Sequence, residues 1–97
     1  MSTHDVMTHA YEEQIDAELE QANAQLAEFE ARAKGKKAKA EINTINLLRT
    51  KHREIEKKRQ DLKTIGEAKV EHSKAEIETE IAKLKTSLAE LATKLKI

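Results

Sequence analysis

Histidine is the residue type in this chain best suited to bind a metal or transfer a proton, and there are four histidines. Three of them have carboxylates one helical turn away: His9 with Glu12 or Glu13, His52 with Glu56, and His72 with Glu76. Each group is a weak two-ligand site, whereas useful transition-metal sites usually need three or four ligands. A di-metal carboxylate site needs Glu-x-x-His, and no histidine here has a glutamate three residues before it. We therefore expect solvated side chains, no metal and no cofactor.

Nucleophilic catalysis has equally little support. The only adjacent serine and histidine are His72 and Ser73, and successive residues of a helix point in different directions. Cysteine is absent, so the chain has no thiolate, disulfide or cysteine-ligated metal. Gly35 and Gly66 stand alone, whereas a phosphate-binding loop needs clustered glycines. We predict that the chain is not an enzyme and has no catalytic residues.

Lysine side chains could contact an anion where they crowd together, as they do at Lys34, Lys36, Lys37 and Lys39. Further bases extend the positive charge to residue 59, and phosphates of nucleic acid or anionic lipid are the candidate partners. Residues 1–33 hold eight acids and one base, whereas residues 34–74 hold thirteen bases and six acids. This balance of −7 against +7 favours neutralisation of the bases by the first segment. Nucleic acid and membrane are the less favoured partners, because aromatic residues for base stacking or membrane anchoring are nearly absent.

The elements that must position these side chains are helices. The 97 residues include two glycines and no proline, and 37% are charged, against roughly 25% in an average globular domain. Disordered chains share this composition, but the regular spacing of the apolar residues argues against disorder. The length suits one domain with a modest core. No stretch has the pattern of a signal peptide or a membrane span, so we expect a cytoplasmic protein.

Three segments carry apolar residues at alternating spacings of three and four, which is the a/d pattern of coiled coils. The first segment predicts a helix over 3–33, with seam residues Ile15, Leu19, Ala22, Leu26, Phe29 and Ala33. The second predicts a helix over 37–65, in which polar His52 and Arg59 occupy seam positions and are interpreted as devices that fix register. The third predicts a helix over 67–96 with the most regular seam: Ile77, Ile81, Leu84, Leu88, Leu91 and Leu95.

The two glycines decide the architecture. The seam loses its register beside Gly35, which predicts a turn at 34–37, whereas the apolar phase changes little across Gly66. Turns at both glycines give an all-α fold, an antiparallel coiled-coil three-helix bundle in a single domain over 1–97, and this is the predicted fold. A turn at Gly35 alone gives a hairpin of one short and one long helix, completed by oligomerisation.

The apolar residues of these segments also form a longer pattern, which is similar to that of a known protein family. The pattern comprises Tyr11, Ile15, Leu19, Ala22, Leu26, Phe29 and Ala33, an Ala/Lys-rich stretch, then Leu62, Ile65 and the aliphatic series from Val70 to Leu88. It resembles a family of small uncharacterised bacterial coiled-coil proteins whose cyanobacterial members include stress-responsive ones. Ala22, Val70 and Ile81 stand where that family has tryptophans. The resemblance implies a helical bundle, no catalytic residues and a role in stress.

These observations predict a non-enzymatic structural or interaction protein that self-associates through the seam from Ile77 to Leu95. Its expected partner is a second copy or another helical protein. The alternative is an adaptor that binds nucleic acid or anionic membrane through the basic surface over 34–59.

Overall fold

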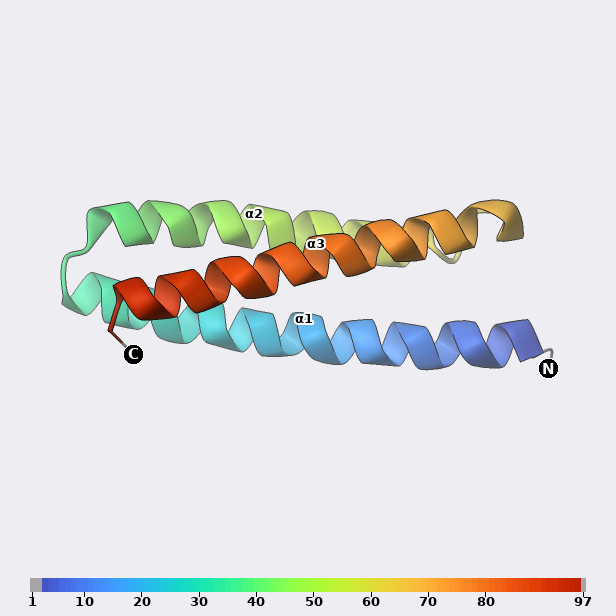
Figure 1. The fold of residues 1–97 in the computed structure, drawn as a ribbon, viewed down its shortest axis with the longest axis horizontal. Helices are drawn as coiled ribbons and strands as arrows, with labels where there is room; N and C mark the ends of the chain where they lie inside the picture. Colours follow the sequence, from blue (N-terminus) through green and yellow to red (C-terminus); the bar gives the residue numbers. More distant parts are fainter. Residues whose placement is uncertain (1–2, 97) are drawn as a thin grey trace.

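The computed structural model describes the backbone of residues 3–96 and the side chains of residues 10–66 and 68–96. Three helices make up this part of the chain: α1 (Thr3–Gly35), α2 (Lys39–Asp61) and α3 (Glu67–Lys94). Each helix packs against the other two, and the three run up, down and up in a rod of 51 × 17 × 16 Å (Figure 1). The predicted three-helix bundle is confirmed, because the chain turns near both glycines rather than at Gly35 alone.

The turn between α1 and α2 is shorter than predicted and covers residues 36–38. The Ala38 N–H donates to the Ala33 carbonyl at 2.9 Å and the Lys37 N–H to the Lys34 carbonyl at 3.1 Å, which is the Schellman arrangement. Its left-handed residue is Lys37, with φ of 56°, whereas Gly35 is the last residue of α1. Ala33 is buried and Ala38 packs against the core, which supplies the apolar contact that usually accompanies this motif.

The turn between α2 and α3 is longer and covers residues 62–66, so α2 ends at Asp61 rather than at residue 65. Thr64 Oγ1 donates to the Asp61 carbonyl at 3.0 Å, and Gly66 is extended with φ of −70° and ψ of 155°. Leu62 is buried and Ile65 packs against the core from within this turn. Apolar residues therefore continue through the turn, which explains why the phase of the sequence barely changes at Gly66.

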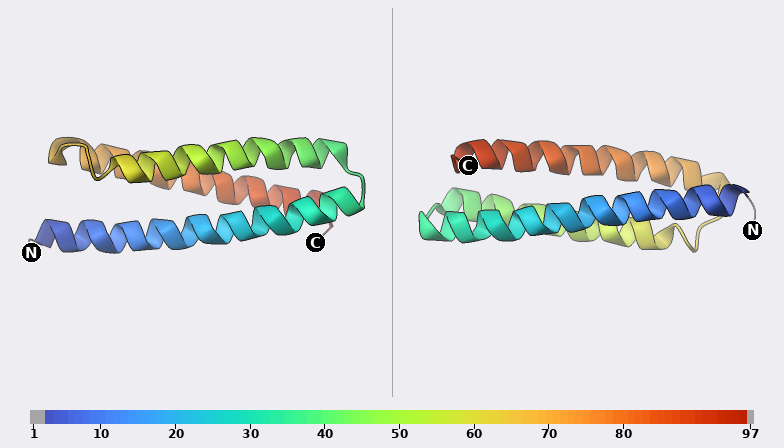
Figure 2. Two further views of the ribbon diagram at one scale, coloured as in Figure 1. Left: turned by 180° about the vertical axis from the view of Figure 1, so that it is seen from behind. Right: turned by 90° about the horizontal axis from the view of Figure 1, so that it is seen from below.

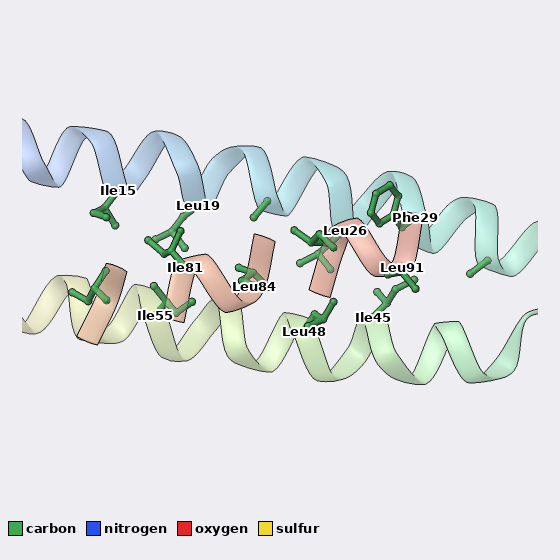
Figure 3. Packing of buried hydrophobic residues seen from close by; sticks show 14 of the residues in the cluster. Ile15, Leu19, Leu26, Phe29, Ile45, Leu48, Ile55, Ile81, Leu84 and Leu91 are labelled. Carbon is green, nitrogen blue, oxygen red and sulfur yellow. The ribbon is translucent and has the colours of Figure 1, made fainter. Parts of the chain in front are cut away.

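The core runs the length of the rod and consists of aliphatic side chains from all three helices, together with Phe29 of α1 (Figure 3). The six residues of the third seam are at most 4% exposed: Ile77, Ile81, Leu84, Leu88, Leu91 and Leu95. They pack against α1 and α2 of the same chain. The seam predicted to serve packing or oligomerisation thus packs within a single chain, which buries it by folding back twice.

Two polar residues of the second seam connect α2 to α1. The His52 ring is 6% exposed, and its Nε2 lies 2.8 Å from the Leu19 carbonyl oxygen, which can only accept a hydrogen bond. Arg59 Nη2 lies 2.7 Å from Asp16 Oδ2 and 3.6 Å from Glu12 Oε2. Both contacts tie a side chain of α2 to one level of α1, and this geometry fits the predicted role in fixing register.

Candidate interaction surfaces

One end of the bundle collects lysines from three segments. Lys34 lies in the last turn of α1, Lys36 and Lys37 lie in the turn that follows, and Lys39 lies at the start of α2. The last turn of α3 reaches the same end, as Figure 2 shows, and Lys36 Nζ donates a hydrogen bond to the Leu95 carbonyl. This contact brings two lysines that the sequence analysis did not single out next to the predicted cluster. We call the combined set the basic tip: Lys34, Lys36, Lys37, Lys39, Lys94 and Lys96.

Most lysines of the basic tip are free to meet a partner. Lys34 pairs with Glu30 at 3.3 Å, and Lys36 is held by its bond to Leu95. The other four tip lysines form no ion pair or side-chain hydrogen bond with any residue whose side chain is described. Glu41, in the first turn of α2, is a nearby acid. The hydrogen bond from Lys34, with the charge of Arg49, holds the pKa of the Glu30 carboxyl below its usual range.

Two of the remaining bases of α2 pair with acids of α1, as the charge blocks predicted, whereas a third pairs with acids of α3. Arg49 Nη2 lies 3.1 Å from Glu30 of α1, and Arg59 pairs with two acids of α1. Lys58 Nζ donates to Glu80 of α3 at 2.7 Å, and this bond raises the pKa of the lysine. Neutralisation therefore covers these bases of the 34–59 surface, while most of the basic tip stays unpaired.

Charge is separated along the rod. Leu19, Ile55 and Ile81 lie at one level near its middle (Figure 3). On one side of this level, residues 3–18 and 56–80 hold twelve acids and six bases, a balance of −6. On the other side, residues 20–54 and 82–96 hold twelve bases and six acids, a balance of +6. We call these the acidic half and the basic half. The acidic and basic blocks of the sequence thus neutralise each other only in part. Antiparallel packing also brings acidic segments together in one half of the rod and basic segments together in the other.

A shallow groove of about 290 Å³ runs between α2 and α3. Its walls include Leu47, Leu48, Ile55 and Leu84, with Lys51, Glu80, Lys83 and Ser87 at the edges. Leu47 is 59% exposed and is the one large apolar side chain found exposed among the described residues. A single exposed leucine is ordinary on a protein surface. Leu47 therefore indicates an interaction surface only when it is considered together with the charged residues around it.

The histidines lie apart from these surfaces. His72 Nε2 is 2.8 Å from Glu76, an exposed pair one turn apart, and His52 Nδ1 is 3.4 Å from Glu56. The side chain of His9 lies outside the described residues. Within the described part of the chain, no three residues of the types His, Cys, Asp and Glu come together as a metal site would require. The helices described are all too polar to cross a membrane.

Topology, rather than any local motif, produces these surfaces. Lys94 and Lys96 join the tip because α3 returns to the turn between α1 and α2, and Leu47 is exposed because it lies off the seam of α2. The separation of charge likewise appears only when three helices are laid side by side. Comparisons of the chain with protein-family models, curated proteins and solved structures found no match, so the proposed uses of these surfaces rest on the geometry described above.

Proposed function

We propose that the chain is a non-enzymatic, cytoplasmic interaction protein that self-associates as an antiparallel, side-by-side pair of bundles. The observation that carries the proposal is the separation of six positive and six negative net charges along a rod 51 Å long. The centres of the halves lie about half that length apart, well beyond the screening length of roughly 8–10 Å in physiological salt. A neighbouring copy therefore experiences two oppositely charged bodies rather than one neutral rod.

Antiparallel pairing is the arrangement that these charges favour. It places the basic half of each copy beside the acidic half of the other, whereas parallel pairing puts like charges together. The whole chain has no net charge, so copies do not repel one another at long range. A two-fold pair also closes on itself and uses one patch twice.

The face between α2 and α3 is the part of the surface that we assign to this contact. It carries the apolar groove with the exposed Leu47, and the groove is lined by Lys83 of the basic half and by Glu80 of the acidic half, which pairs with Lys58. Exposed ion pairs each contribute at most about 1 kcal/mol. The pair should therefore be weak, with its dissociation constant in the micromolar range, and sensitive to salt.

Light scattering over a range of protein concentrations tests this proposal. We expect the mass to rise from one chain toward two at low salt and to return to one chain at about 1 M salt, where the screening length is about 3 Å. Leu47→Glu should keep the chain monomeric. The matched control is Thr50→Glu, which adds the same charge at an exposed site of α2 that does not line the groove. A monomer under all conditions, or a pair insensitive to both salt and Leu47→Glu, would refute the proposal.

Orientation can be tested separately because the chain has no cysteine. Lys39→Cys places a thiol at the basic end of α2, and Lys63→Cys places one at its acidic end. A short thiol cross-linker should join the two variants to each other in a mixture, and should join neither variant to itself. Self-coupling of Lys39→Cys would indicate a parallel pair instead.

A role in stress is part of the proposal on the strength of the family resemblance alone. We expect the amount of the protein to rise after heat or oxidative treatment of its host cells. Quantitative immunoblotting checks this expectation, and an unchanged amount after both treatments would remove the stress role without affecting self-association.

A further inference from the structure

We propose that the basic tip is a binding surface for anionic lipid bilayers, on which the bundle stands end-on. This goes beyond self-association, because a single bundle carries the complete tip, whereas in an antiparallel pair the acidic half of the partner lies beside each tip. Four of the six tip lysines have no charged partner among the described side chains. Clusters of four to eight basic residues are the size of surface that binds anionic headgroups.

The fold holds these lysines in one place. α1 ends beside the last turn of α3, and the bond from Lys36 to the Leu95 carbonyl joins the two. Lys37 and Lys96 both adopt left-handed backbone conformations, with φ of 56° and 60°, so each lies where its chain leaves the helix direction. The lysines are therefore carried by helix ends that the core fixes, with Ala33 and Leu95 buried directly behind them.

The shape of the tip favours a planar partner. The rod is only 16–17 Å across, and its basic end consists of two helix C-termini and one helix N-terminus. Within residues 3–96, no helix side or strand edge projects there to enter a nucleic-acid groove, which is how base readout is usually achieved. A flat array of headgroups, in contrast, can meet all the tip lysines at once. The tip also has few arginines and lacks the aromatic residues that stack on bases.

The separation of charge sets the orientation. Near an anionic surface the basic half is attracted and the acidic half is repelled, so a rod with both halves turns its basic tip toward the surface. The far end of the rod is about 51 Å away, beyond the reach of the surface potential at physiological salt. Binding of this kind relies on charge alone, and should therefore be reversible and lost at high salt.

Vesicle co-sedimentation tests the proposal with two matched variants. One replaces the four unpaired tip lysines, Lys37, Lys39, Lys94 and Lys96, with glutamine. The other replaces Arg53, Lys57, Lys63 and Lys69, which are also exposed, lack ion pairs with described residues and lie outside the groove assigned to self-association. Both variants lose four charges from exposed positions, and circular dichroism confirms that each keeps its helices.

We expect the wild-type chain to bind vesicles of phosphatidylserine and phosphatidylcholine, and not vesicles of phosphatidylcholine alone. The tip variant should lose affinity by about a hundredfold or more, since each lysine near such a surface contributes about fivefold. The control should stay within a few-fold of the wild type. Absence of binding, or equal loss in both variants, would overturn the proposal. So would equally tight, tip-dependent binding to duplex DNA, because the tip would then recognise phosphate on either partner.

Tyr11 reports the orientation, since it is the only tyrosine in a chain without tryptophan. It lies in α1 within the acidic half, far from the tip. At protein concentrations below those at which copies pair, its fluorescence should therefore be unaffected when the protein binds vesicles that contain brominated lipids. Strong quenching of Tyr11 would mean that the rod lies flat, which would refute end-on binding.

Discussion

The two halves of the bundle share one apolar core but are stabilised by different interactions. In the basic half the core is aliphatic and aromatic apart from His52, which lies at the border with the acidic half; Leu26, Ile45 and Leu91 are at most 1% exposed, and the turn has three residues. In the acidic half the core contains a buried acid, Glu12, which lies beside Arg59, and the turn has five residues. The same three helices thus run through both halves, but apolar packing joins them in the basic half, whereas a buried ion pair contributes in the acidic half.

This difference teaches where stability and where specificity reside. Burial of apolar surface contributes roughly 25 cal/mol per Å² whichever neighbour provides the contact. A buried ion pair gains little net free energy but is costly to break, so it disfavours any register in which its partners separate. We infer that the basic half contributes most of the stability, while the polar contacts of the acidic half select the alignment of α2 on α1.

Truncating one leucine in each half should give the largest changes in the free energy of unfolding, and so tests this comparison most directly. Leu26→Ala should lower the free energy of unfolding by an amount near the top of the range of about 2–5 kcal/mol, because three helices surround the cavity and prevent collapse. Leu62→Ala deletes the same atoms within the turn of the acidic half, where the chain can relax, and should fall near the bottom of that range. Urea unfolding followed by circular dichroism measures both, and equal costs would contradict the comparison.

Breaking the buried ion pair should have an intermediate effect. Arg59→Met keeps the aliphatic stem but leaves Glu12, whose side chain is 11% exposed, without its cation. We expect the free energy of unfolding to fall by about 1–3 kcal/mol. The value should lie toward the lower end of this range, because the substitution also removes Arg59 Nε, which is buried without a hydrogen-bond partner among the described residues. Lys58→Met is the matched control, since its pairs with Glu76 and Glu80 lie at the surface and should contribute at most about 1 kcal/mol.

A double variant shows whether Glu12 is the cause. Replacing Glu12 with glutamine in the Arg59→Met background should recover part of the lost stability, because the neutral amide is cheaper to bury than an unpaired carboxylate. If Arg59→Met and Lys58→Met cost the same, the acidic half would have no special dependence on its buried pair.

The sequence predicted the fold well because the fold follows from local spacing. Every position of the first and third seams is buried, since alternation of three and four places these residues on one face of any helix. His52 and Arg59 were also recognisable as polar residues on a seam. Their partners were not, because Leu19 contributes only a backbone carbonyl, and a sequence pattern cannot show which carbonyl a distant helix presents.

The turns and the surfaces were harder to predict, because they depend on contacts between residues far apart in the sequence rather than on local spacing. Gly35 marked the right region, but the residue in the left-handed conformation is Lys37, two positions later. Whether the third seam packs within one chain or between two chains depended on the Gly66 region. The chain reverses there, so the apolar residues of the third seam are buried within a single molecule. Lys94 entered the basic tip only through this reversal. Such features depend on residues far apart in the chain, and one-dimensional periodicity carries no information about them.

The smallest expected effect concerns Tyr11, which joins α1 to α3 in the acidic half. Its hydroxyl donates to the Lys74 carbonyl at 2.9 Å. Burial, together with the charges of Glu78, Glu18 and Glu71, raises its pKa from 10.0 to about 12. A raised pKa of an acid means that the folded state favours the neutral phenol. The resulting contribution to stability is complete below pH 10 and is lost as the pH rises through 12.

Ultraviolet absorbance of the phenolate measures this directly, because the chain has one tyrosine and no tryptophan. The midpoint should be near 12 in the folded protein and near 10 in urea. Lysines ionise in the same range, so Tyr11→Phe is the control, and its stability should decline less steeply between pH 10 and 12. Because Tyr11 depends on α1 and α3 staying together, its midpoint also reports local opening of the acidic half. A midpoint near 10 in a chain whose helices remain folded would mean that this end of the bundle opens independently of the basic half.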